Sequence, residues 1–335
     1  MPYNKIDNKK IRTLPLSFRQ NKMTVGDIKQ LYELDDIDFQ NEELDILVQR
    51  IIAAHNNQKQ VILMMGAHPL RRGNSRFIID LMERGIVTHI ATNGATAIHD
   101  FELAFLGGTL EDVDFYVRDG KFGNWKETGE YINRAIKWGY NKGRGFGESI
   151  GIMISSEELS YLMPHKDISI FAAAVRLGIP ITVHKGIGYD ITDQHPSADF
   201  SAIGKTSGDD FLVFANSIRK LEGGVFLNIG SQVMGPEVYL KALSMARNLA
   251  RQDGEEIKHF TTAVFDIVDL GDWRAGNGDV VDCHNPANLQ DSRYYFRPFK
   301  SILVRTVKDG GESFYIQGDF SVTIPALYKK VISLI

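Results

Sequence analysis

Two strand-to-helix junctions in this chain have the composition of a phosphate-binding turn. The first contains Thr92-Asn93-Gly94-Ala95, and the second contains Gly230-Ser231-Gln232. Glycine lets a ligand or another backbone come close, and the first N–H groups of the following helix point outward without partners. A single turn of this kind is more often structural in α/β proteins, but two in one chain predict a nucleotide cleft.

Histidines and aspartates near strand ends could supply acid–base chemistry. His68, His99 and His184 adjoin apolar segments, and Asp190 lies in the loop that His184 opens. A neutral imidazole can accept a proton near pH 7, so His99 or His184 is predicted to be a general base, with Asp190 as a further catalytic candidate. The same groups could instead hold a metal ion. Because no pair has the His-Glu-x-x-His spacing, polar lining of an active site is the favoured interpretation and no metal site is predicted.

Cationic side chains in the same loops favour an anionic ligand. Arg71 and Arg72 follow the first long apolar run, and Lys185 follows His184. Guanidinium groups suit carboxylates and phosphates because they donate two parallel hydrogen bonds. These cations could bind an anionic substrate or the phosphates of a cofactor, or they could lie in solvent.

Alternating strands and helices must position these groups. Strands are predicted, from short apolar runs, at residues 60–66, 87–91, 180–184, 224–229 and 261–267. Helices are predicted at residues 42–56, 75–84, 99–105, 125–138, 168–177, 210–221, 238–251 and 324–334. This alternation indicates an α/β fold, a doubly wound and mainly parallel sheet with helices on both faces. The strand-end loops of such a sheet gather on one side, where ligands usually bind.

Three other segments carry weaker patterns. Residues 300–307 and 313–316 are predicted to form a hairpin around Lys308-Asp309-Gly310-Gly311, and residues 27–33 have helical spacing. The glycine-rich residues 139–149 are either a flexible connector or a mobile anion-binding lid.

The composition is that of a globular protein. With 335 residues, 43% of them hydrophobic, the chain can bury a large core, and we expect an N-terminal arm with helices over residues 1–56 and a single α/β domain over 57–335. The net charge of −4 favours neither nucleic acid nor a membrane surface as a partner. Cys283 is the only cysteine, which excludes an intrachain disulfide. Neither a signal peptide nor a membrane span is evident, so a cytoplasmic location is expected.

Taken in chain order, several segments resemble deoxyhypusine synthase, the NAD-dependent enzyme that transfers an aminobutyl group from spermidine to a lysine. The resemblance is distant and runs from about residue 60 to the C-terminus. Residues 66–75 occupy the place of the family's first polar loop, and Thr92-Asn93-Gly94-Ala95 matches its Thr-Ala-Gly-Gly turn. Tyr189-Asp190 matches its Gly-Asp pair, Gly230-Ser231-Gln232 its Gly-Gly-Gly turn, and residues 315–325 its Tyr-Ala-Asp-Ala-Ser segment.

The resemblance implies a Rossmann-like fold, NAD as cofactor and assembly as a homotetramer. The cofactor-binding residues it suggests are Thr92, Asn93, Gly94, Gly230, Ser231, Asp319 and Ser75. Asp319 could accept hydrogen bonds from a ribose, but it is equally suited to cap the helix that follows.

Lys300 is the nearest counterpart of the family's catalytic lysine. The family has this lysine in a Trp-Gly-Lys-Ile segment, and the counterpart here is Pro298-Phe299-Lys300-Ser301-Ile302. A lysine in an apolar site loses proton affinity and can attack a carbonyl or an imine, so the resemblance implies a nucleophile. An ordinary strand-edge lysine is the alternative.

One departure from the family bears on the substrate. The paired glutamates of deoxyhypusine synthase correspond here to Ile98 and His99. A polyamine without acidic partners would be costly to desolvate, so spermidine is not the expected substrate. We therefore expect an NAD-dependent transferase of this type that acts on another small amine or amino compound. The alternatives are a non-catalytic nucleotide-binding protein and a metal-dependent hydrolase that uses the His/Asp cluster.

Overall fold

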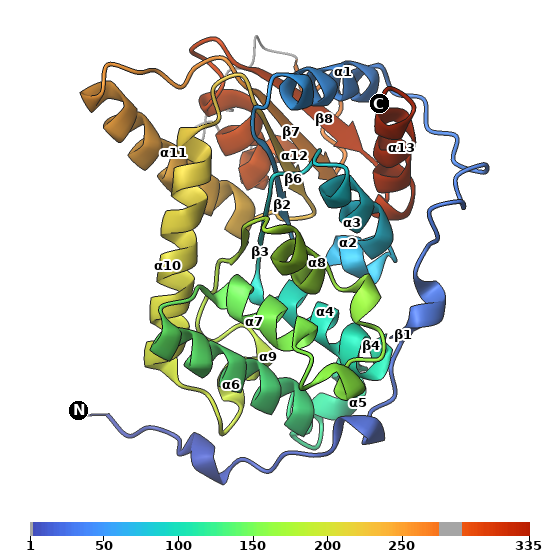
Figure 1. Cartoon of the computed structure of the whole chain (residues 1–335), viewed down its shortest axis with the longest axis vertical. Coiled ribbons are helices and arrows are strands. Elements are labelled where there is room, and N and C mark those ends of the chain that lie inside the picture. Colours follow the sequence, from blue (N-terminus) through green and yellow to red (C-terminus); the bar gives the residue numbers. More distant parts are fainter. Residues whose placement is uncertain (1–2, 275–289) are drawn as a thin grey trace.

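The structure, a computed structural model, describes residues 3–274 and 290–335 and is built around one parallel sheet (Figure 1). Cys283 lies outside these residues. The sheet contains β2 (Val61–Met65), β3 (His89–Thr92), β5 (Ile181–Val183), β6 (Val225–Ile229), β7 (Thr261–Asp266) and β8 (Glu312–Gln317). All neighbouring strands in it are parallel.

The strand order is β5-β3-β2-β6-β7-β8. Counted along the chain from β2, this is the order 3-2-1-4-5-6 of dinucleotide-binding folds. The chain moves outward from β2 on one side through β3 and β5, then returns to the other side of β2 with β6. A crevice therefore opens between β2 and β6 at the carboxyl ends of the strands, because the following loops leave in opposite directions.

Apolar side chains on both faces of the sheet explain why helices cover both of them. Every residue of β2, β3, β6 and β7 is buried. One face packs against a layer of helices that includes α1 (Glu42–Asn56), α3 (Ser75–Glu83), α8 (Ile170–Leu177) and α13 (Phe320–Ile332). The other face packs against α10 (Phe200–Arg219) and α11 (Met234–Gln252). The predicted fold class is confirmed.

Most of the remaining helices surround the lower part of the molecule in Figure 1. They are α2 (His68–Arg71), α4 (Gly94–Leu106), α5 (Val113–Val117), α6 (Lys126–Lys142), α7 (Phe146–Ser155) and α9 (Ile191–Gln194), whereas the short α12 (Ser292–Tyr295) lies in the upper part. A separate antiparallel pair joins β1 (Met23–Thr24) to β4 (Gly108–Thr109). No helix in the described part is both long enough and apolar enough to cross a membrane.

The predicted hairpin at residues 300–316 is wrong. Phe299–Arg305 is a π-helix, and β8 pairs in parallel with β7 instead of folding back on the preceding segment. Helical winding buries Phe299, Ile302 and Leu303 against one face of the sheet, where an extended strand would have turned alternate residues outward.

Two further expectations fail for local reasons. Residues 27–33 form turns after a short 3-10 helix (Val25–Asp27), and Ile28 is the only fully buried residue of that segment. Residues 139–149 belong mostly to the end of α6 and the start of α7, joined by a short connection. A Cβ at Gly145 would lie 1.9 Å from the Asp210 carboxylate, so this connection is packed and is no open lid.

The N-terminal arm runs along the outside of the molecule before it reaches α1 (Figure 1). Its first residues pass below α6, and later ones approach α5 and β4. α1 then packs against α13 and β8, and its Leu44, Leu47 and Ile51 enter the main core. The division at residue 56 stays a prediction, although α1 shares its core with the α/β domain.

Candidate functional site

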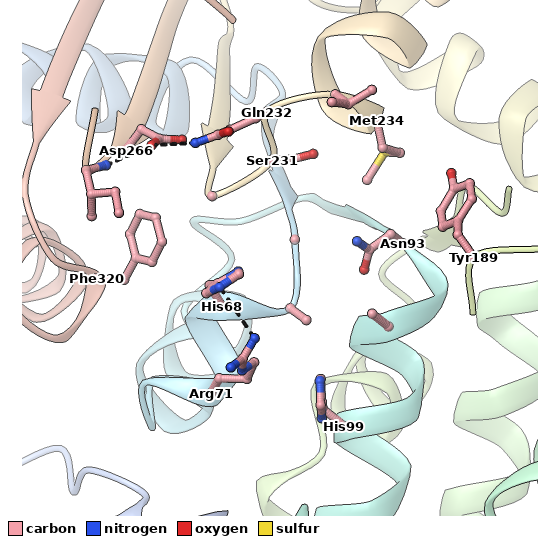
Figure 2. Close-up of a pocket in the computed structure, with 16 residues that line it drawn as sticks. His68, Arg71, Asn93, His99, Tyr189, Ser231, Gln232, Met234, Asp266 and Phe320 are labelled. Carbon is pink, nitrogen blue, oxygen red and sulfur yellow. Dashed lines mark hydrogen bonds between the residues drawn. The ribbon is translucent and has the colours of Figure 1, made fainter. Parts of the chain in front are cut away.

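A cleft of about 550 Å³ lies at the carboxyl ends of the strands, where the crevice is expected. Its walls come from the segments that follow β2, β3, β6, β7 and β8 and from the loop after β5. Figure 2 shows Asp266 and Phe320 on one side of the cavity, Tyr189, Asn93 and His99 on the other, and Ser231 between them. Residues far apart in the sequence thus share one cavity.

Two glycines determine the shape of the cleft floor. Gly66 ends β2 beside Gly230, and a Cβ at Gly66 would lie 2.4 Å from the Gly230 carbonyl oxygen. Gly230 has φ of +62°, the left-handed region that favours glycine, and its own Cβ would lie 2.9 Å from the Phe320 ring. Larger residues at either position would close the crevice.

The turn after β6 leads into α11 with its helix N-terminus open to the cleft. The Asn228 side chain donates to the Ser231 carbonyl (2.9 Å), and the Ser231 hydroxyl accepts from the Gly235 N–H (2.8 Å). The residue before the helix, Val233, makes no side-chain cap, and both Val233 and Met234 line the cavity. A helix N-terminus of this kind favours a phosphate group.

Asp266 places a carboxylate at the end of β7, on the α13 side of the cleft. Its Oδ1 accepts from Gln232 Nε2 (3.1 Å) and from the Ile267 N–H (2.8 Å), while no donor in the described part of the chain reaches Oδ2. Burial raises the pKa of Asp266 above its ordinary value. We did not single out this residue from the sequence. A carboxylate directly after a buried strand was the signal available.

The turn after β3 is differently arranged. Asn93 lines the cleft and caps α4, since its Oδ1 accepts from the Thr96 N–H (3.0 Å) and hydroxyl (2.9 Å). Gly94 is buried behind it, and a Cβ there would lie 2.1 Å from an Asp190 carboxylate oxygen. A glycine is therefore required at this position because the loop after β5 packs against it.

Asp190 belongs to a buried cluster that fixes the loop after β5. The Lys185 ammonium lies 2.7 Å from Asp190 and 2.6 Å from Asp193, and all three side chains are at most 5% exposed. Burial raises the pKa of Asp190, although Lys185 opposes the shift. This arrangement also carries Tyr189 to the edge of the cleft.

His99 projects from α4 into the cavity (Figure 2). Burial lowers the pKa of His99 to about 4, so the imidazole is neutral at pH 7 and can accept a proton. His68 lies nearby, 3.4 Å from an Arg71 nitrogen, and burial together with the two neighbouring arginines lowers its pKa. Arg71 itself makes no ion pair with any described residue.

A side cavity of about 240 Å³ adjoins the cleft and shares Arg71, His99 and Tyr189 with it. Glu111 supplies a carboxylate to its wall and accepts from the Trp125 indole N–H (2.8 Å). Asp190 also lines this space, and much of the remaining wall is apolar. The side cavity therefore combines an arginine, carboxylates and apolar surface within a small volume.

Several predicted site residues lie away from both cavities. His184 is buried against Phe214, with a ring distance of 5.1 Å, and burial lowers its pKa to about 3. Lys300 lies in the π-helix with its ammonium 4.6 Å from the Tyr294 ring centre. Asp319 caps α13 and pairs with Arg72 at 2.8 Å.

Two more of the predicted site residues, Thr92 and Ser75, lie just outside the cleft. Thr92 is fully buried at the end of β3, where its carbonyl accepts from the His184 N–H (2.8 Å). Ser75 is buried at the start of α3. Of the predicted cofactor-binding residues, Asn93, Gly230 and Ser231 line the cleft directly.

The structure separates the histidines that the sequence seemed to gather. His184 follows β5 and packs against Phe214, His68 and His99 face the cleft, and His195 packs on Gly129. Within residues 3–274 and 290–335, no three His, Cys, Asp or Glu side chains are arranged to hold a metal ion.

Comparisons with known proteins bear on the fold. No family model matches the sequence, and a search of curated proteins gave no match. Among solved structures, ArgZ, an arginine dihydrolase from the ornithine-ammonia cycle in cyanobacteria, matches with a TM-score of 0.51 and 12% identity, over 89% of this chain and 34% of that chain. The ternary complex of AgrE with ornithine and NAD⁺ matches with a TM-score of 0.49 and 14% identity, over 87% of this chain and 33% of that chain.

A third match is an Entamoeba histolytica protein described as a "putative deoxyhypusine synthase", with a TM-score of 0.46 and 10% identity over 88% of both chains. The chain spans about a third of the length of the ArgZ and AgrE structures. At such identities the similarity concerns the fold alone. With a TM-score of 0.51 at 12% identity, the ArgZ match supports a similarity of the fold alone.

Proposed function

We propose that this chain binds NAD in the cleft and uses it to oxidise a small amino compound. The observation that carries the proposal is the position of the cleft, between β2 and β6 of a sheet with dinucleotide-binding strand order. The sequence resemblance to an NAD-dependent family supports the same interpretation, and ArgZ, which is similar in fold, is described as an arginine dihydrolase, an enzyme that acts on an amino compound. Neither of them decides the substrate.

The lining residues fit a dinucleotide. Asp266 has a free carboxylate oxygen that would accept from ribose hydroxyls, and the open N-terminus of α11 would hold the pyrophosphate. The close approach of Gly66 and Gly230 leaves the backbone accessible between these two groups. The turn after β2, the first strand of the parallel sheet along the chain, lacks the Gly-x-Gly-x-x-Gly pattern. The details of phosphate binding would therefore differ from the commonest arrangement. When bound, NAD⁺ would accept a hydride from the substrate carbon.

The side cavity is the proposed substrate site. Arg71, which has no acidic partner in the described part of the chain, would bind an anionic group, and Glu111 would bind an amino group. Its volume of about 240 Å³ is below the roughly 300–1,000 Å³ of pockets for drug-sized ligands, so the substrate is small. His99 lies where the two cavities meet and would take the proton that the substrate nitrogen loses.

The transfer step with its nucleophile and the oligomeric state stay predictions. Transfer of the oxidised fragment to a second amine, with Lys300 as nucleophile, comes from the family resemblance, whereas Lys300 is not among the residues that line either cavity. Assembly as a homotetramer rests on the same resemblance. A non-catalytic nucleotide-binding protein is the alternative that shares the cleft.

Calorimetric titration with NAD⁺ tests the cofactor assignment. We expect Asp266→Asn to weaken binding about tenfold, because one hydrogen bond to a charged group contributes about 1.5–3 kcal/mol. The control Asp319→Asn removes the other candidate ribose acceptor and should leave affinity unchanged. No binding by the wild-type protein would refute the proposal. Incubation of the NAD⁺ complex with small amines and amino acids, followed at the absorbance of reduced nicotinamide, then separates an enzyme from a binding protein.

A further inference from the structure

Arg19, from the N-terminal arm, reaches the interior of the α/β domain. Its guanidinium donates to both carboxylate oxygens of Glu102 in α4, at 2.7 and 2.8 Å, and both side chains are 1% exposed. The guanidinium also donates to the Asn21 side chain at 2.8 Å. A bidentate pair of this kind fixes the carboxylate in one orientation.

Glu102 is held in its ionised form. Burial alone would raise its pKa, but the Arg19 charge and several hydrogen bonds outweigh burial and lower the pKa below the ordinary value. Thr128 donates its hydroxyl to Oε1 (2.8 Å), and Thr109 donates its hydroxyl to Oε2 (2.6 Å). The carboxylate can only accept in these contacts, so each threonine hydroxyl hydrogen is committed to Glu102.

This commitment determines the tautomer of His99. The Thr109 hydroxyl oxygen lies 2.7 Å from His99 Nδ1 and has no second hydrogen to donate. Nδ1 must therefore carry the proton and donate it to Thr109, which leaves a lone pair on Nε2. No group in the described part of the chain forms a hydrogen bond with Nε2, and the ring lies where the cleft and the side cavity meet.

We propose that Arg19, Glu102 and Thr109 are positioning residues that hold His99 with Nδ1 protonated, so that Nε2 accepts a proton from the substrate nitrogen. In that step the substrate N–H bond breaks, its electron pair stays on nitrogen, and the proton forms a new bond to Nε2. The resulting imidazolium lies one threonine hydroxyl away from the Glu102 carboxylate, which stabilises its charge. The inference rests on the proposed function for its chemistry, but the tautomer follows from the Arg19–Glu102 ion pair and the hydrogen bonds, whatever the substrate is.

The proposal gives the N-terminal arm a role in the site. Arg19 lines the side cavity together with Glu102, and among the described residues it is the only ion-pair partner of Glu102. Without this charge the buried carboxylate would take up a proton and could then donate to Thr109. Thr109 could then donate its hydroxyl hydrogen to Nδ1. In that tautomer the imidazole proton would be on Nε2, which could no longer accept a proton.

Nuclear magnetic resonance of protein labelled with ¹⁵N-histidine, without NAD, tests the tautomer directly. We expect His99, assigned with His99→Gln, to show a protonated Nδ1 and an unprotonated Nε2 at pH 7. Thr109→Val should shift the ring toward the opposite tautomer, and Thr109→Ser should restore the wild-type signals. The matched control is Thr206→Val, which removes a buried hydroxyl that donates to backbone carbonyls within α10 and has no contact with Glu102 or His99, and it should leave the signals unchanged.

Activity provides the second readout. With an amine that reduces NAD⁺, Thr109→Val should lower kcat at least tenfold with little change in KM, whereas Thr206→Val should not, because a correctly oriented base contributes about 10²–10⁴-fold to the rate. A wild-type His99 protonated on Nε2, or equal effects of the two valine variants, would overturn the inference. If the wild-type protein fails to bind NAD⁺ while its His99 has the expected tautomer, the proposed function fails and the positioning of His99 stands. The wild-type spectrum decides the tautomer even if a variant does not fold.

Discussion

The turn after β3 and the turn after β6 both lead from a buried parallel strand through small residues into a helix, yet only one of them has its glycine in the wall of the cleft. After β3, the Asn93 side chain caps α4, and Gly94 is packed against Asp190. After β6, the Ser231 hydroxyl accepts from the Gly235 N–H, the N-cap residue Val233 adds no cap of its own, and Gly230 lines the cleft. A glycine at such a turn can therefore make room for a ligand or for another part of the same protein. The neighbouring loop decides which.

The largest difference between the turns should appear with alanine at Gly94. A methyl group there would lie 2.1 Å from Asp190 and would force apart the buried pair with Lys185. We expect Gly94→Ala to lower the free energy of unfolding in urea by about 3 kcal/mol, the scale for breaking a buried ion pair. The control Gly208→Ala lies in α10 with open space around it and should raise stability by about 0.5–1 kcal/mol. Equal stabilities of the two variants would contradict the packing role of Gly94.

Acid should weaken the β3–β5 side of the sheet. His89 in β3 is fully buried, and burial lowers its pKa to about 3. The unfolded chain binds this proton near pH 6.5 and the folded chain does not, so His89 contributes stability above pH 6.5 that is lost as the pH falls toward 3. Between pH 6 and 4.5, the unfolding free energy of the wild type should fall more steeply than that of His89→Gln, by about 1.4 kcal/mol per pH unit. Parallel curves would show that His89 titrates normally.

The fold was predictable because strands and helices leave local patterns. The apolar runs at residues 61–65 and 225–229 indicate buried strands, and residues 42–56 were predicted as the helix that α1 forms. The π-helix at Phe299–Arg305 was not, because its apolar residues suit a strand as well as a helix until the sheet face beside them is known.

The site was predictable only in part, since its contacts join distant residues. Asn93, Gly230 and Ser231 could be identified by their turns. The pair Arg19–Glu102 spans 83 residues and has no local pattern. The chemistry of His99 depends on that pair, and so only the three-dimensional structure distinguishes it from His184.

Alanine at Gly230 should affect ligand binding more than stability. The left-handed backbone costs a non-glycine residue about 1–2 kcal/mol, and the new methyl group would press on the Phe320 ring in the cleft wall. Gly254→Ala is the matched control, because Gly254 has φ of +76° but no atom within 4 Å of the added Cβ. Both variants should lose stability by the backbone cost, Gly230→Ala should lose somewhat more stability in urea because of the Phe320 contact, and calorimetry should show NAD⁺ affinity reduced about tenfold for Gly230→Ala alone. An equal affinity of the two would place the dinucleotide elsewhere.

The smallest effect is expected at the cap of α4. Asn93→Ala removes the acceptor for the Thr96 N–H and should cost about 1 kcal/mol of unfolding free energy, as should Asn41→Ala at the start of α1. Because the Asn93 oxygen is already engaged by α4, its loss should change NAD⁺ affinity by less than about threefold, which corresponds to about 0.6 kcal/mol. A larger loss of affinity, with the stability of the two variants equal, would mean that the turn after β3 also binds the ligand. The contrast with the turn after β6 would then no longer hold.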